Sequence, residues 1–157
     1  MADLIARTLD TPAARDAALL AARLTAGGLL IFGVADNIVS SARMAEFAKF
    51  LGAFGFPAPS IMAPLSVWTQ FAAGVMIVLG LGTRIGGLLC AANMIVALIV
   101  VDAQNGVRAA YPAASLVVLG LIFAAIGPGR IALDAFRASG ASDGARTRDL
   151  RRDRPAL

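Results

Sequence analysis

The stretch GVMIVLGLGTRIGGLLCAANMIVALIV, residues 74–100, is the most informative about the fold, because its 27 residues carry a single formal charge, Arg84, near the middle. The apolar run begins earlier, and only Arg84 and a few uncharged polar side chains interrupt residues 61–101. One helix over that run, at ~1.5 Å per residue, would measure about 60 Å, roughly twice the hydrocarbon thickness of a bilayer. The chain must therefore fold back on itself.

The turn is predicted at residues 80–84, which read Gly-Leu-Gly-Thr-Arg. Gly80 and Gly82 accept the backbone angles that end a helix, and Thr83 is expected to cap the next one. This interpretation places Arg84 at a membrane surface, where a cation can meet phosphate head groups.

Composition favours a membrane protein, since 59% of the residues are hydrophobic and 15% are charged. A soluble helical bundle would need a polar stripe on each helix, yet the charges between residues 61 and 126 are limited to Arg84, Asp102 and Arg108. The net charge of +4 does not indicate a nucleic-acid partner, because the basic residues flank apolar spans and form no patch with interleaved aromatic residues.

Several redox chemistries are excluded within this chain. It has no histidine and one cysteine, Cys90, which excludes bis-histidine haem ligation, a CxxC thiol pair and a Cys/His zinc site. Residues 80–87 do not match the dinucleotide pattern G-x-G-x-x-G and follow no strand. We therefore expect no metal site, no cofactor bound by the chain alone and no self-contained redox enzyme.

The sequence predicts an all-α polytopic membrane protein, a bundle of four transmembrane helices at about residues 17–39, 61–81, 85–101 and 109–126. Asp10-Thr11-Pro12 is typical of a helix start, and the first span lacks the cleavage site of a signal peptide. The predicted organisation is a cytoplasmic segment over residues 1–16, a membrane domain over 17–136 and a disordered basic tail over 137–157.

Four spans place both termini on one side, and the lysine and arginine bias predicts that this side is cytoplasmic. The external segment between the first two spans, residues 40–60, carries a stripe at helical spacing: Met44, Phe47, Leu51 and Phe54. This pattern predicts an amphipathic loop helix, which either lies in the outer interface or packs as a lid on the mouth of the bundle.

Polar residues at the outer level of the bundle form a candidate pocket: Asp36, Asn37, Gln70, Asp102, Asn105 and Arg108. Thr69 lies in the same polar layer. The functional hypothesis is a site for a polar head group such as a quinone ring, with Gln70 hydrogen-bonding the ring and a carboxylate relaying a proton. The alternative is hydrogen bonding that only fixes the helices, at ~0.6 kcal/mol per bond.

At the inner level the cations favour an anchoring role. Arg84 and Arg130 are expected to contact head groups, and Arg23 to snorkel to the same surface. Asn93, deep in the third span, is interpreted as a residue that hydrogen-bonds between helices.

The chain resembles the DoxX family of small four-helix bacterial membrane proteins. The resemblance rests on GLLIFGVADNI with GFPAP about twenty residues later, on TQFAAGVMIVLGLGTR and on GPGRIALD. It implies two motifs at the inner face. The first consists of Gly80, Thr83 and Arg84, and the second of Gly127, Pro128, Gly129, Arg130 and Asp134. This chain departs from the family at three positions. The family usually has a glutamate in the second span, where this chain has Gln70. It often has a lysine near the end of the first span, where this chain has Asp36 or Asn37, and a histidine after the third span, where this chain has Asp102.

The resemblance implies a multi-pass protein of the bacterial inner (plasma) membrane, associated with respiratory or thiol-redox complexes. The favoured function is a non-catalytic or quinone-contacting subunit of a membrane redox complex, with quinone as the candidate ligand. The alternatives are a small-solute or lipid carrier and an assembly scaffold for another membrane protein. The expected partners are the lipid bilayer and either a membrane redox partner or further copies of the chain.

Overall fold

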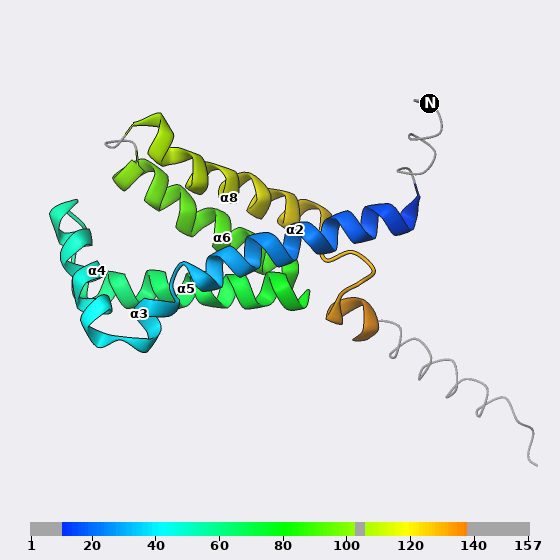
Figure 1. Cartoon of the computed structure of the whole chain (residues 1–157), viewed down its shortest axis with the longest axis horizontal. Coiled ribbons are helices and arrows are strands. Elements are labelled where there is room, and N and C mark those ends of the chain that lie inside the picture. Colours follow the sequence, from blue (N-terminus) through cyan, green and yellow to red (C-terminus); the bar gives the residue numbers. More distant parts are fainter. Residues whose placement is uncertain (1–10, 103–105, 138–157) are drawn as a thin grey trace, which may run out of the picture.

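A computed structural model describes residues 11–102 and 106–137, and this part of the chain is helical with no strand (Figure 1). The predicted all-α class is therefore confirmed. The elements are α2 (Pro12–Phe32), α3 (Ala35–Val39), α4 (Ser41–Ala53), α5 (Pro59–Leu79), α6 (Thr83–Ala97), the π-helical turn η1 (Leu98–Asp102) and α8 (Val107–Ile126). Most of the predicted tail and of the N-terminal segment lies outside the described residues.

Three segments are long and apolar enough to cross a membrane: Pro59–Leu79, Thr83–Val101 and Arg108–Ile126. Helix α2 has 21 residues but is not among them, and it carries Arg15, Asp16 and Arg23. The chain is thus a membrane protein with three candidate spans.

Helix α2 begins as predicted, with Pro12 in its first turn and Thr11 as the cap, whose Oγ1 accepts a hydrogen bond from the Ala14 amide at 3.2 Å. It ends at Phe32, and α3 starts two residues later, so the predicted span over residues 17–39 consists of two helices. At the break the Val34 amide donates to the Ile31 carbonyl at 3.3 Å, which leaves the Leu30 carbonyl without its usual helical donor.

The predicted glycine turn between α5 and α6 is confirmed, because Gly80 and Gly82 have φ of 69° and 59°. The expected capping role of Thr83 is wrong. Gly82 is the N-cap, and Thr83 is the first helical residue, with an Oγ1 that is buried and has no hydrogen-bond partner among the described residues. The Asp134 carboxylate accepts a hydrogen bond from the Gly82 amide at 2.7 Å and so ties the segment after α8 to this turn.

Helix α5 is central to the bundle: it packs against α2 and α6, while α6 packs along α8 (Figure 1). Glycine pairs bring the backbones together at two of these contacts. A Cβ at Gly74 of α5 would lie 2.9 Å from the Gly27 carbonyl of α2, and one at Gly120 of α8 would lie 2.7 Å from the Gly87 carbonyl of α6. Both crossings therefore require glycine.

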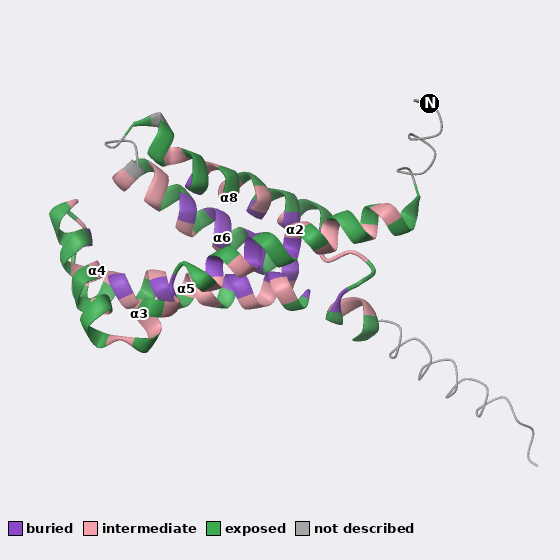
Figure 2. Cartoon of the chain, viewed as in Figure 1, coloured by how far each residue is buried: buried purple, intermediate pink, exposed green. Residues whose placement is uncertain are grey.

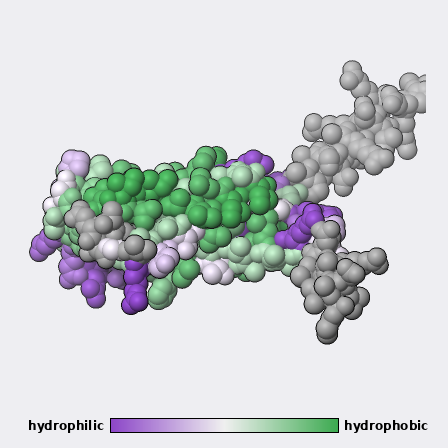
Figure 3. Space-filling model, turned by 90° about the horizontal axis from the view of Figure 1, so that it is seen from above, coloured by the Kyte–Doolittle hydropathy of each residue, from purple (hydrophilic) through white to green (hydrophobic). Residues whose placement is uncertain are grey.

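Buried residues gather where α2, α5 and α6 meet, and the outward sides of the helices are exposed (Figure 2). Leu30, Ile77 and Phe123 are fully buried in this core. Large apolar side chains such as Val118, Leu121 and Ile126 remain exposed on α8. Figure 3 shows a hydrophobic belt on one face, with hydrophilic residues toward the two ends. Such a belt suits contact with lipid chains.

Candidate ligand cavity

A cavity of about 380 Å³ lies between α4, α5 and α6. Its walls are mostly apolar, and none of the described residues that line it is charged. The lining residues are Phe47, Phe50, Leu51, Phe56, Met62, Leu65, Ser66, Thr69, Leu89, Ala92, Asn93, Val96, Ala97 and Val101.

Helix α4 supplies an aromatic wall because its phenylalanines recur at helical spacing. The rings of Phe47 and Phe50 are stacked with centroids 6.2 Å apart, and Phe50 meets Phe54 at 4.8 Å. Leu51, 5% exposed, holds the helix against the bundle. Ser40 caps the helix by accepting a hydrogen bond from the Arg43 amide at 3.3 Å. The helix is therefore capped at its start and packed against the bundle near its end.

Three uncharged polar side chains form a strip on the opposite wall. Ser66 and Thr69 lie three residues apart on α5 and so share one face of that helix, and Asn93 reaches the strip from α6. The Thr69 hydroxyl has no hydrogen-bond partner among the described residues. The cavity therefore combines an apolar volume with one polar side.

A chain of hydrogen bonds begins at this strip and joins α5, α6 and α2. Ser66 Oγ donates to Asn93 Oδ1 at 3.0 Å, and Asn93 Nδ2 donates to Gln70 Oε1 at 3.2 Å. Gln70 Nε2 then donates to the Leu30 carbonyl at 3.2 Å, at the break between α2 and α3. We call these four residues the amide relay. The interpretation of Asn93 as an interhelical residue is confirmed.

A second polar cluster lies at the other end of the bundle and centres on Arg23 of α2, which is 1% exposed. Its Nε and Nη2 donate to the carbonyls of Ile77 and Val78 at 2.8 and 2.9 Å, and its Nη1 donates to those of Pro128 and Ile131 at 2.7 and 2.8 Å. The expectation that Arg23 snorkels to the surface is wrong, because backbone carbonyls already satisfy the guanidinium.

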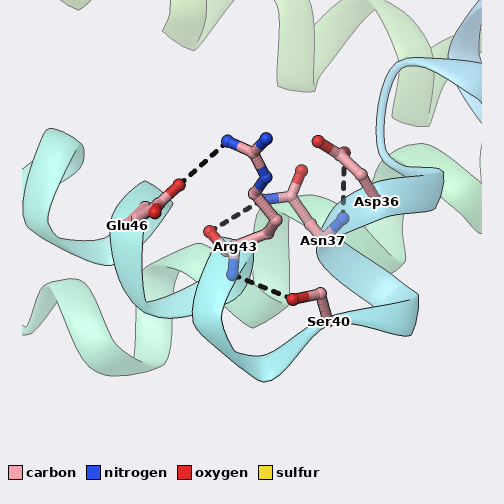
Figure 4. Close-up of polar contacts among 5 residues, drawn as sticks. All are labelled: Asp36, Asn37, Ser40, Arg43 and Glu46. Atoms are coloured by element: carbon pink, nitrogen blue, oxygen red, sulfur yellow. Dashed lines mark hydrogen bonds and ion pairs between the residues drawn. The ribbon is translucent and has the colours of Figure 1, made fainter.

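Of the predicted outer residues, Thr69 lines the cavity, whereas Asp36 and Asn37 do not. Asp36 is exposed and accepts a hydrogen bond from the Asn37 amide at 2.9 Å, while Asn37 Nδ2 donates to the Arg43 carbonyl at 3.2 Å. Arg43 pairs with Glu46 at 3.1 Å (Figure 4). These contacts fix the corner between α3 and α4, and Gln70 is separated from them in the amide relay.

The remaining outer residues lie near the α6–α8 connection. Arg108 is exposed at the start of α8. Asn105 lies outside the described residues, and Asp102 is described only as the last residue of η1.

The predicted inner residues surround the Arg23 cluster. Gly80 leaves room for the guanidinium, because a Cβ there would collide with Arg23 Nη2. Gly127 and Gly129 turn the chain after α8 with φ of 86° and 74°. Pro128 supplies a carbonyl to Arg23, and the Arg130 amide donates to Asp16 Oδ1 at 3.1 Å. Arg84 is exposed, with one long bond of 3.4 Å to the Ala124 carbonyl.

Sequence reasoning missed Ser66 as a lining residue and Arg23 as the centre of a buried cluster. A signal for Ser66 was present, since Ser66, Thr69 and Gln70 follow helical spacing on one span. No comparable signal pointed to the four carbonyls around Arg23, because any residue type provides a carbonyl.

A comparison with protein families matches residues 18–103 to the family described as DoxX. The match covers more than half of the chain and confirms the resemblance inferred from the motifs. The searches among curated proteins and among solved structures gave no match.

Proposed function

Given that the chain belongs to the DoxX family, we propose that it is a non-catalytic membrane subunit that holds a quinone-type lipid for a membrane redox complex. The observation that carries this proposal is the cavity between α4, α5 and α6, an apolar volume with one polar strip. A quinone-type lipid has the same division, with an apolar tail and a ring that bears oxygen atoms.

The size and walls of the cavity support such a ligand. Its volume of about 380 Å³ falls within the usual range of ligand pockets, roughly 300–1,000 Å³. Phe47 and Phe50 offer ring faces for offset stacking on an aromatic or quinoid ring. Thr69 and Asn93 can donate hydrogen bonds to ring oxygens, and Ser66, whose hydroxyl is donated to Asn93, can accept one from a ring hydroxyl.

The lining residues favour holding the ligand over converting it. Reduction of a quinone takes up protons, and a site for that reaction needs a titratable side chain within hydrogen-bond reach. The described lining contains no carboxylate, lysine or histidine, and Asp36 is hydrogen-bonded at the α3–α4 corner. Electron transfer is therefore assigned to a partner protein in the complex.

The proposed topology has four spans, with α2 and α3 together as the first. The burial of Arg23 against four carbonyls supports this, because a charge inside a membrane domain is tolerated when it is paired or hydrogen-bonded away from lipid. Both termini and the α5–α6 turn then lie on the cytoplasmic side of the inner membrane, where exposed Arg84 and Arg130 contact head groups.

In this topology α4 lies at the outer face. The charged side chains of α4, Arg43, Glu46 and Lys49, are exposed, and its aromatic side covers the cavity. An amphipathic helix with this division fits the boundary between head groups and lipid chains. We infer that α4 is both the outer wall of the site and its contact with the membrane surface.

The test is purification of the tagged full chain from native membranes in mild detergent, with extraction of bound quinone and identification of proteins that co-purify. The variant Ser66→Ala/Thr69→Val/Asn93→Leu makes the polar strip apolar and is expected to lower bound quinone at least about tenfold, since each lost bond contributes about 0.5–1.5 kcal/mol. Ser115→Ala is the matched control, because Ser115 is exposed on α8 away from the cavity.

The proposal is abandoned if wild-type protein contains no quinone above the level of an unrelated membrane protein purified in the same way. Quinone bound equally by the wild type and the triple variant would move the site away from the cavity. A redox enzyme that co-purifies in fixed ratio supports the subunit role. If the chain carries quinone but no partner protein co-purifies, the subunit role is refuted and the ligand site stands.

A further inference from the structure

The amide relay has only one possible direction. Its last member is the backbone carbonyl of Leu30, which can accept a hydrogen bond but cannot donate one. Gln70 must therefore turn its NH₂ group toward Leu30 and its Oε1 toward Asn93. Asn93 must in turn present its NH₂ group to Gln70 and its Oδ1 to Ser66. Swapping the amide atoms of either side chain would bring two donors or two acceptors together.

This direction decides what Ser66 can offer to a ligand. Its only hydrogen is donated to Asn93 Oδ1, so the lone pairs of Ser66 Oγ are all that remains for the cavity. Ser66 is therefore an acceptor there and not a donor. Thr69, three residues along the same face, has a hydroxyl with no partner among the described residues, and can donate or accept.

We propose that the cavity selects a lipophilic ligand whose ring carries a hydroxyl group, the quinol or phenol form, over one that carries only carbonyl or ether oxygens. A ligand hydroxyl donates to Ser66 Oγ while its oxygen accepts from Thr69. A carbonyl or ether oxygen accepts from Thr69 but leaves the lone pairs of Ser66 Oγ without a donor in an apolar cavity. This inference rests on the proposed ligand site and specifies which form of the ligand it holds, and no chemical change of the ligand is involved.

The remaining amide hydrogen of Asn93 does not alter the preference, because hydroxyl and carbonyl oxygens can both accept it. Discrimination thus comes from Ser66. One hydrogen bond of ordinary strength corresponds to a preference of about threefold to tenfold.

The test uses two redox-inert probes, para-nonylphenol and its methyl ether para-nonylanisole, which differ in a single hydrogen-bond donor. Each is titrated into the purified full chain in nanodiscs, and binding is measured by calorimetry. The quantity compared is the ratio of the two Kd values in wild type and in Ser66→Ala, because partition of the probes into lipid cancels between the proteins. We expect the wild-type ratio to favour the phenol by about fivefold relative to Ser66→Ala.

A second variant tests the direction of the relay without changing the lining. Gln70 does not line the cavity, yet it holds the orientation of Asn93. Gln70→Leu releases Asn93, which frees the Ser66 hydroxyl to donate into the cavity, so the phenol preference should fall toward that of Ser66→Ala. Ser115→Ala should keep the wild-type ratio. Gln70 is thus a positioning residue, and a merely structural role would leave the ratio unchanged.

The outcomes separate this inference from the proposed function. If wild-type protein binds both probes but shows no phenol preference relative to Ser66→Ala, the selectivity is refuted and the ligand site stands. Failure of the folded protein to bind either probe refutes both. If Ser66→Ala does not fold, Gln70→Leu decides alone: an unchanged ratio refutes the directed relay.

Discussion

The two ends of the bundle use polar residues in opposite ways. At the arginine end, around Arg23, every hydrogen bond of the guanidinium goes to a backbone carbonyl, and the side chain is 1% exposed. At the cavity end, the first member of the amide relay is Ser66, which lines a cavity of about 380 Å³. At the arginine end the guanidinium is bonded within the protein, whereas the cavity end leaves acceptor and donor positions for a ligand.

Packing separates the same two regions. The arginine end includes Gly80, where a Cβ would lie 2.6 Å from that of Ala132, and the fully buried Phe123. In the cavity wall, Phe50 is 43% exposed. Tight helix contacts and an accessible site therefore coexist in this protein because they lie at different levels of the bundle. Substitutions at the arginine end should therefore lower the free energy of unfolding more than substitutions at the cavity end.

Arg23→Met is expected to be the most damaging substitution. It removes four charge-assisted hydrogen bonds that join α2 to the end of α5 and to residues 128–131, and a loss of at least ~4 kcal/mol follows from the usual strength of such bonds. The measurement is reversible unfolding of the purified protein in detergent by circular dichroism. Arg84→Met is the control, because exposed Arg84 makes one bond of 3.4 Å. Equal losses in the two variants would contradict the buried role of Arg23.

A pair of phenylalanine truncations compares the two ends directly. Phe123→Ala opens a cavity in the core and should cost ~3 kcal/mol, whereas Phe50→Ala enlarges a space that already exists and should cost less than ~1 kcal/mol. Thermal midpoints of both variants in the same detergent give the comparison. A larger loss for Phe50→Ala would mean that the cavity end, and not the arginine end, holds the bundle together.

Adjacent glycines of α2 provide the third comparison. A Cβ at Gly27 would lie 2.8 Å from the Gly74 carbonyl and 2.6 Å from Val78 Cγ2, while one at Gly28 would meet nothing within 4 Å. Gly27→Ala should therefore destabilise by ~2 kcal/mol through overpacking. Gly28→Ala should be neutral or stabilise by up to ~1 kcal/mol through helix propensity. Similar midpoints for the two variants would refute the close α2–α5 crossing.

The smallest effect on stability is expected in the amide relay. Gln70→Leu removes two interhelical hydrogen bonds, each worth ~0.6 kcal/mol on average in membrane proteins, for a loss of about 1 kcal/mol. The same unfolding measurement applies. A loss as large as that of Arg23→Met would show that the relay is a main support of the fold and not a secondary one.

Much of the helical organisation was predictable from local sequence. The Gly80 and Gly82 turn follows from glycine in a left-handed backbone conformation, and the start of α2 follows from Thr11 and Pro12. The break at residues 33–34 was not predicted, because a single glycine in an apolar run is compatible with a continuous helix.

The candidate site was predictable only in part. Gln70 was predicted as a polar side chain within an apolar span, but Asp36, a carboxylate expected beside it, is not among the described residues that line the cavity. Hydrogen bonds such as that from Asn93 to Gln70 join residues 23 positions apart and depend on the rotation of α6 against α5. Periodicity gives the buried side of each helix but not which polar side chains meet across it.

The contacts of Arg23 also constrain the order of events during biosynthesis. Its guanidinium bonds the Ile131 carbonyl, which is 108 residues further along the chain, so a ribosome must synthesise nearly the whole membrane domain before this partner exists. Until then the guanidinium lacks two of its four carbonyl partners. Helix α2 therefore completes its hydrogen bonds only after residues 128–131 have been synthesised, and the segment after α8 closes the Arg23 cluster last.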